Sequence, residues 1–205
     1  MILHKSMAPF AYIGGERCTA GLSCASVRAR RMDRDPAALE SLRAAGRTGA
    51  AIFATCCAER LRPLLEHVPS GAAPLVAGIA LTDLWRVLEG LSRPDPRRLH
   101  ELSNACWTLV EIEPVPGVRT EHLEILVAAT RDALEAYLSG NSQHAFEAAK
   151  KCLTVAGDDE PARQSRDAGE IAAAREALPK LATRMRERAE SEGAKLVRNL
   201  VEEKP

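Results

Sequence analysis

The sequence has few aromatic residues, no paired-cysteine motif and no long apolar run, and each absence argues against a class of protein. Phe, Trp and Tyr make up 3% of the 205 residues. Together with the scarcity of β-branched runs, this argues against a sheet. No apolar stretch approaches the roughly 20 residues that span a membrane. The six cysteines include no Cys-x-x-Cys pair and no secretory leader is apparent, so we expect a cytoplasmic protein with reduced thiols.

The chain also has no net charge, which removes the general electrostatic reason for binding nucleic acid or an anionic membrane. The charge is unevenly placed, however. Residues 1–31 contain five basic residues and one acidic residue, so the rest of the chain carries a net charge of −4. We expect residues 1–31 to be a disordered N-terminal extension and residues 32–205 to form the helical domain. A transit peptide is the alternative for the first segment, which is rich in arginine and poor in acids.

What the sequence does have is a strong helical composition, dominated by alanine, leucine, arginine and glutamate. Apolar residues recur at helical spacing, and helix start and stop signals divide them into segments. The pattern predicts an all-α, single-domain bundle of about six to seven helices. The expected helices begin near residues 35, 48, 74, 95, 120, 142 and 168.

Local signals fix several of the expected boundaries. Asp35-Pro36 and Asp95-Pro96 each pair a capping residue with proline at the first helical position. Gly140 suits the left-handed position after a helix, and Asn141 offers a cap to the next one. Residues 157–167 (GDDEPARQSRD) are polar and are expected to form a loop. The last helix, residues 168–202, is expected to bend at its internal proline.

No pattern of reactive residues predicts chemistry. No Glu-x-x-His pair of the kind that binds metals in helical bundles occurs, and the chain has no phosphate-binding glycine loop or nucleophile elbow. Cys56 and Cys57 would point about 100° apart on a helix, so they cannot easily share a metal or a disulfide. Cys56 is expected in the core, and Trp85 and Trp107 are expected to meet there. We therefore assign no catalytic, cofactor-binding or metal-binding residue.

Four residues are candidates for contact with a partner. Glu111 and Glu113 lie in the segment EIEPVPG, residues 111–117, where two prolines and a glycine predict a rigid, exposed loop. The alternative is a simple connector. Glu59 and Arg60 lie in the expected helix of about residues 48–67, near the boundary of its apolar part, where Glu59 can serve a binding site or form a structural ion pair with an arginine on a neighbouring helix.

Four segments in this order carry a family resemblance: residues 57–63 (CAERLRP), Leu84-Trp85 with Leu88, residues 111–117 (EIEPVPG) and residues 138–156 (LSGNSQHAFEAAKKCLTVA). Together they resemble the YjaG-like bacterial family of unknown function, over about residues 48–202. The chain departs from that pattern at residues 71–73 and in a shorter 157–167 loop, and residues 1–31 have no counterpart. The resemblance implies an all-helical cytoplasmic bacterial protein and implies no catalytic residues.

The leading hypothesis is a non-enzymatic, helical protein-binding protein, of the kind that acts as an immunity protein against a cognate toxin. An acidic folded region would be steered towards a basic partner. The alternative is an enzyme or small-ligand-binding bundle with an interhelical pocket, using Glu59, His122 or Glu113. Arginines of the last helix alternate with glutamates, so no nucleic-acid site is expected. The sequence leaves the oligomeric state open, and an exposed apolar stripe on that helix would suggest a homodimer.

Overall fold

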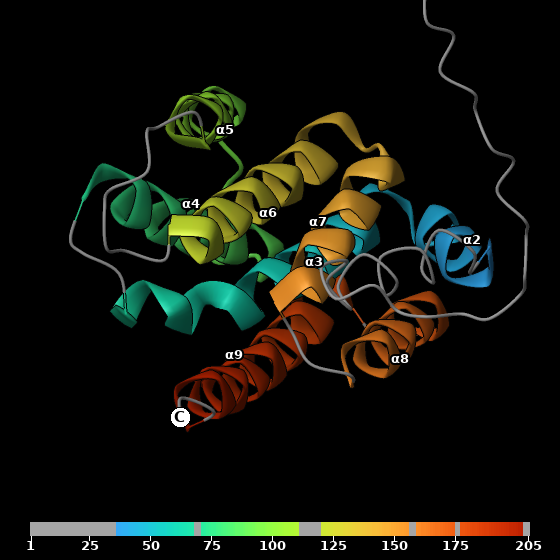
Figure 1. Cartoon of the computed structure of the whole chain (residues 1–205). Coiled ribbons are helices and arrows are strands. Elements are labelled where there is room, and N and C mark those ends of the chain that lie inside the picture. Colours follow the sequence, from blue (N-terminus) through green and yellow to red (C-terminus); the bar gives the residue numbers. More distant parts are fainter. Residues whose placement is uncertain (1–35, 68–70, 111–119, 156–158, 175–176, 203–205) are drawn as a thin grey trace, which may run out of the picture.

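The structure, a computed structural model, describes residues 36–67, 71–110, 120–155, 159–174 and 177–202. Within these ranges all regular structure is helical, which confirms the expected all-α single-domain bundle (Figure 1). The expected disordered extension, residues 1–31, and the candidate loop that holds Glu111 and Glu113 lie outside the described residues. The helices are α2 (Pro36–Ala44), α3 (Gly46–Leu61), the 3₁₀ helix η1 (Arg62–His67), α4 (Ala72–Leu88), α5 (Pro96–Val110), α6 (Thr120–Ser139), α7 (Ser142–Val155), α8 (Glu160–Ala173) and α9 (Leu178–Glu202).

Most helix boundaries follow the local signals in the sequence. Gly46 and Gly140 adopt left-handed backbone conformations, with φ of +67° and +70°. Gly46 begins α3 directly after α2, and Gly140 lies between α6 and α7. Asn141 Oδ1 accepts a hydrogen bond from the Gln143 N–H at 2.9 Å at the start of α7. Asp95 Oδ1 caps α5 in the same way. These ends were predictable because their causes lie within a few residues of the boundary.

The prediction of a loop over residues 157–167 is wrong, because α8 begins at Glu160. Proline follows Glu160 directly and suits the first helical turn. Glu160, Gln164 and Asp167 recur at helical spacing and are all buried, so this helix has a polar buried face that a search for apolar periodicity misses. The single last helix is also wrong. It is divided into α8 and α9, and Pro179 lies in the first turn of α9, where a proline removes no helical hydrogen bond.

Helix α3 lies at the centre of the bundle and contacts α2, α4, α6, α7, α8 and α9 (Figure 1). Every residue from Gly49 to Leu61 is buried, so this part of α3 has no solvated face. Apolar side chains from all the surrounding helices complete the core around it. Any polar side chain on α3 therefore needs a partner inside the protein.

The two tryptophans do not meet in the core as expected. Trp85 on α4 is fully buried, whereas Trp107 on α5 is 56% exposed. Cys106, the residue before Trp107, points into the core. Successive helical residues are rotated by about 100°, so Trp107 is carried to the outer face.

The apolar residues of α9 are used inside this fold. Leu181, Met185 and Leu196 are all buried, and α9 packs along α3. The exposed stripe that would have favoured a homodimer is therefore absent from the part of α9 whose side chains are described. Among the described helices, none combines the length and apolar character needed to cross a bilayer.

Candidate functional site

The end of α3 carries two adjacent charged residues into the interior. Glu59 and Arg60 are each 1% exposed. An unpaired buried charge is costly, so each side chain must be compensated by neighbouring groups. Neither residue offers a surface for direct contact with a partner, and the structure supports the ion-pair interpretation of both.

Three carboxylates surround the Arg60 guanidinium, and we call these four residues the Arg60 cluster. Arg60 Nη1 lies 3.0 Å from Glu160 Oε1, and Nε lies 2.8 Å from Glu192 Oε2. Nη2 pairs with Asp167 Oδ2. Burial alone would disfavour the charged form, but the attraction of Glu160 and Asp167 outweighs it and raises the pKa of Arg60 well above its usual value. The cluster joins α3 to α8 and α9.

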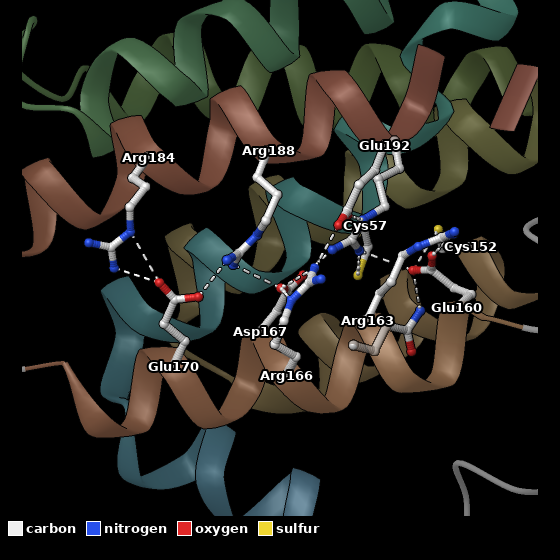
Figure 2. A network of polar contacts seen from close by, with 12 residues as sticks. Cys57, Cys152, Glu160, Arg163, Arg166, Asp167, Glu170, Arg184, Arg188 and Glu192 are labelled. Atoms are coloured by element: carbon white, nitrogen blue, oxygen red, sulfur yellow. Dashed lines mark hydrogen bonds and ion pairs between the residues drawn. The ribbon is translucent and has the colours of Figure 1, made fainter. Parts of the chain in front are cut away.

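The Arg60 cluster continues towards the surface as a ladder of ion pairs between α8 and α9 (Figure 2). Arg188 bridges Asp167 Oδ1 at 2.9 Å and Glu170 Oε2 at 2.6 Å. Arg166 Nη2 reaches Glu192 Oε1 at 2.7 Å. Partial burial opposes ionisation of Glu170 and Glu192, but hydrogen bonds from arginines prevail and lower the pKa of both carboxyls. The ladder fixes α8 against α9 through side chains that apolar periodicity does not report.

The thiols next to the Arg60 cluster are not set up as nucleophiles. Cys57 Sγ lies 3.9 Å from Arg60 Nη1, and Cys152 Sγ lies 3.3 Å from Glu160 Oε1. Burial raises the pKa of both thiols well above the usual value, with a smaller opposing effect from Arg60. Burial also raises the pKa of Cys106, to about 11. At neutral pH these thiols stay protonated and act as packing groups.

Glu59, the residue before Arg60 on α3, points in a different direction and has its own partners. Trp85 Nε1 donates a hydrogen bond to Glu59 Oε2 at 2.9 Å, and Arg62 Nη1 lies 3.2 Å from Oε1. Burial raises the pKa of Glu59, and the Arg62 charge and the Trp85 hydrogen bond only partly offset it. Ionised Glu59 therefore opposes folding. This cost is absent below the unfolded-state pKa and appears as the pH rises through the folded-state pKa.

We predict that Glu59→Gln preserves or raises stability at pH 7, whereas Glu59→Ala lowers the free energy of unfolding by about 1–3 kcal/mol. Glutamine keeps an acceptor for the Trp85 N–H and removes the cost of a buried negative charge. Alanine leaves the Trp85 N–H without an acceptor. Urea unfolding of both variants at pH 4 and pH 7 measures the effect. The Glu59→Gln variant should gain on the wild-type protein as the pH rises, and a loss on raising the pH would contradict the assignment.

A second group of polar residues lies at the surface, on α5, α6 and α7. One open hollow there has a lining that we call the Trp107 surface. It consists of Ser103, Asn104, Trp107, Arg131, Glu135 and His144. The Arg131 guanidinium lies 4.6 Å from the centroid of the Trp107 ring, within cation–π distance. Ser103 Oγ donates to Glu135 Oε1 at 2.5 Å. Buried Asp132 holds this region together by pairing with Arg131 at 3.0 Å and with Lys151 of α7.

Sequence reasoning found some of these residues and missed others. It singled out Glu59 and Arg60, but it did not find the acids of α8 and α9 that compensate Arg60. Recognising Glu160-Pro161 as a helix start would have revealed the buried polar face of α8. His122, proposed for the alternative interhelical pocket, is half-buried in α6. Among the described residues, no group of three or more His, Cys, Asp or Glu side chains is arranged to hold a metal ion.

Comparison of the chain with family models, curated proteins and solved structures finds no match. The resemblance to the YjaG-like family therefore stays a prediction.

Proposed function

We propose that this chain is a helical protein-binding protein whose contact region is the Trp107 surface. The observation that carries the proposal is the exposure of Trp107, a large aromatic side chain stacked against Arg131 beside an open hollow. Tryptophan and arginine are the residues most enriched at the energetic centres of protein interfaces. The Asp132 ion pairs hold Arg131, so the surface is ordered before binding and loses little side-chain freedom.

The size of the hollow favours a protein side chain over a drug-sized ligand or a whole cofactor. Its volume is about 270 Å³. That lies below the roughly 300–1,000 Å³ of most ligand pockets, and it suits one side chain from a partner. The polar groups at its edge, including Asn104 and Glu135, resemble the polar rim that surrounds an interface core. The alternative, an enzyme or small-ligand-binding bundle, has less support. The described thiols are protonated at neutral pH, and a thiol must lose its proton to act as a nucleophile.

The more specific parts of the proposal rest on charge and on the family resemblance. Residues 32–205 carry a net charge of −4, which favours a basic partner such as a toxin that acts on nucleic acid. We therefore propose an immunity-type role, within a YjaG-like family. The four described cysteines are free thiols, in keeping with a reducing compartment such as the cytoplasm.

The test compares how tightly Trp107→Ala and a control, Leu75→Ala, bind a partner protein. Leu75 is the matched control, because it is 64% exposed and lies on α4 outside the Trp107 surface. Tagged full-length proteins are used to capture partners from the cells that produce this chain, and the affinity of any captured protein is then measured by calorimetry. We expect Trp107→Ala to weaken binding about 30-fold or more, the effect of losing a residue worth about 2 kcal/mol.

Leu75→Ala should bind like the wild-type protein, and both variants should keep the wild-type melting temperature. If every captured protein binds Trp107→Ala as tightly as the wild-type chain, the Trp107 surface is not the contact region. A captured partner that is acidic and does not act on nucleic acid would contradict the immunity-type role while leaving the binding surface intact.

A further inference from the structure

A second hollow lies where α4 ends and α5 begins, and three arginines line it. Gly90 adopts a left-handed conformation, with φ of +71°. The N–H groups of Leu91 and Ser92 both donate to the Arg86 carbonyl, at 2.8 and 3.1 Å. These bonds fold the turn back over the end of α4. As a result Arg86 of α4 and Arg93 of the turn line the same hollow.

Two of the three guanidinium groups have no partner within the part of the chain that the structure describes. Arg98 Nε donates to Asp83 Oδ2 at 2.6 Å, so its charge is compensated. Among the described residues, the Arg86 and Arg93 guanidiniums make no ion pair or hydrogen bond. The remaining acid in the lining, Asp95, already caps the first turn of α5. With three arginines against Asp83 and Asp95, the lining keeps a net positive charge, and among the described residues two of its guanidiniums are unpaired.

The rest of the lining suits a compact anion attached to an apolar group. The Ser92 hydroxyl adds a polar group to the arginines, whereas Val87 and Leu99 supply apolar surface. Leu91, in the same turn, is largely exposed and offers a further apolar contact. The hollow has a volume of about 170 Å³, which is enough for one anionic group but not for a whole cofactor.

We propose that this hollow binds the phosphate dianion of a small organic phosphate, with Arg86 and Arg93 as its main ligands. The planar fork of a guanidinium matches phosphate oxygens in a bidentate manner. Two unpaired guanidinium forks favour a phosphate monoester, with its three acceptor oxygens, over a carboxylate, which has two. Ser92 and the free Nη groups of Arg98 provide further donors. The site is separate from the Trp107 surface, so failure of either proposal leaves the other unaffected.

Phenyl phosphate is the probe for the test, with benzoate as a monoanion of similar shape and inorganic phosphate as the free ion. Calorimetric titration of the full-length protein at constant ionic strength should show binding of phenyl phosphate. The double variant Arg86→Ala/Arg93→Ala should weaken that binding at least 10-fold, and benzoate should bind at least 10-fold more weakly than phenyl phosphate. Binding should tighten between pH 5 and pH 7, because the second ionisation of a phosphate monoester lies near pH 6.

Arg97→Ala is the matched control for the loss of positive charge. Arg97 lies in the first turn of α5, next to Arg98. It pairs with Glu101 and does not line the hollow. This variant should bind phenyl phosphate within twofold of the wild-type protein. Arg86→Lys/Arg93→Lys keeps the charge and should still bind more weakly, since lysine cannot form the bidentate contact.

Four outcomes would overturn the proposal. The first two are that neither phenyl phosphate nor inorganic phosphate binds below 10 mM, or that benzoate binds as tightly as phenyl phosphate. The other two are that the double alanine variant binds phenyl phosphate like the wild-type protein, or that Arg97→Ala loses as much affinity as that variant. Tighter binding of phenyl phosphate than of inorganic phosphate would support an organic phosphate as the ligand. Equal binding of the two would support the phosphate site and identify the free ion. The melting temperature of each variant shows whether it is folded, and the double lysine variant tests the site if the alanine variant is not.

Discussion

Replacing Arg60 with alanine is expected to lower the free energy of unfolding by about 3–5 kcal/mol, the cost of removing one partner from a buried ion pair. The substitution leaves Glu160, Asp167 and Glu192 facing one another without the cation that they share. Partial compensation by Arg166 and Arg188 comes from groups nearer the solvent. Chemical unfolding followed by circular dichroism measures the loss.

Arg166→Ala is the matched control for this experiment. Arg166 contacts two of the same acids, Asp167 and Glu192, but it is exposed. Its removal is expected to cost at most about 1 kcal/mol, as for other solvent-exposed ion pairs. Equal effects of Arg60→Ala and Arg166→Ala would show that burial does not make Arg60 the central member of the cluster.

The loss caused by Arg60→Ala should also depend on pH. In the wild-type protein, hydrogen bonds from Arg60 and Arg166 hold the pKa of Glu192 below its usual value despite partial burial. A carboxyl with a lowered folded-state pKa stabilises the fold above its unfolded-state pKa, and this contribution is lost as the pH falls through the folded-state pKa. The difference between wild-type and variant should therefore be largest near pH 7 and shrink below about pH 4.

Replacing Gly193 with alanine is expected to lower the free energy of unfolding by about 1–3 kcal/mol, although alanine is the better helix former. Gly193 lies where α9 crosses the end of α3. A Cβ atom there would lie 2.7 Å from the Arg60 carbonyl oxygen and 3.0 Å from the Arg60 Cα. Both are backbone atoms, so the two helices would have to separate, which would also disturb the contact between Arg60 and Glu192.

Gly169→Ala is the matched control, because Gly169 lies within α8 and a Cβ atom there would meet nothing within 4 Å. That substitution should stabilise the protein by roughly 0.5–1 kcal/mol through helix propensity alone. Opposite signs for the two variants, measured by thermal and urea unfolding, would support the close approach of α3 and α9. Stabilisation by both would show that the two helices separate easily.

Two of the expectations that failed share a cause, which is that sequence patterns report local preference and average polarity. The segment 157–167 resembles a loop because its residues are polar. Its polar side chains are nonetheless the buried face of α8, since Arg60 provides a charged partner for them. Trp107 is expected in the core because it lies beside the apolar face of its helix and on the helix that follows that of Trp85. It lies outside because Cys106 occupies the inward position, and Arg131 covers part of its ring.

The sequence by itself determined the helical class and most helix ends. Helix propensity and apolar periodicity depend on residues within one or two turns of each other. The same holds for helix ends such as Asp95-Pro96 and Gly140, so distant residues are not needed to predict them. Only the tertiary structure decided which charges meet. Arg60 is separated from Glu160, Asp167 and Glu192 by 100, 107 and 132 residues. A buried charge needs a partner, and the packing of α8 and α9 against α3 decides which carboxylates lie within reach of Arg60.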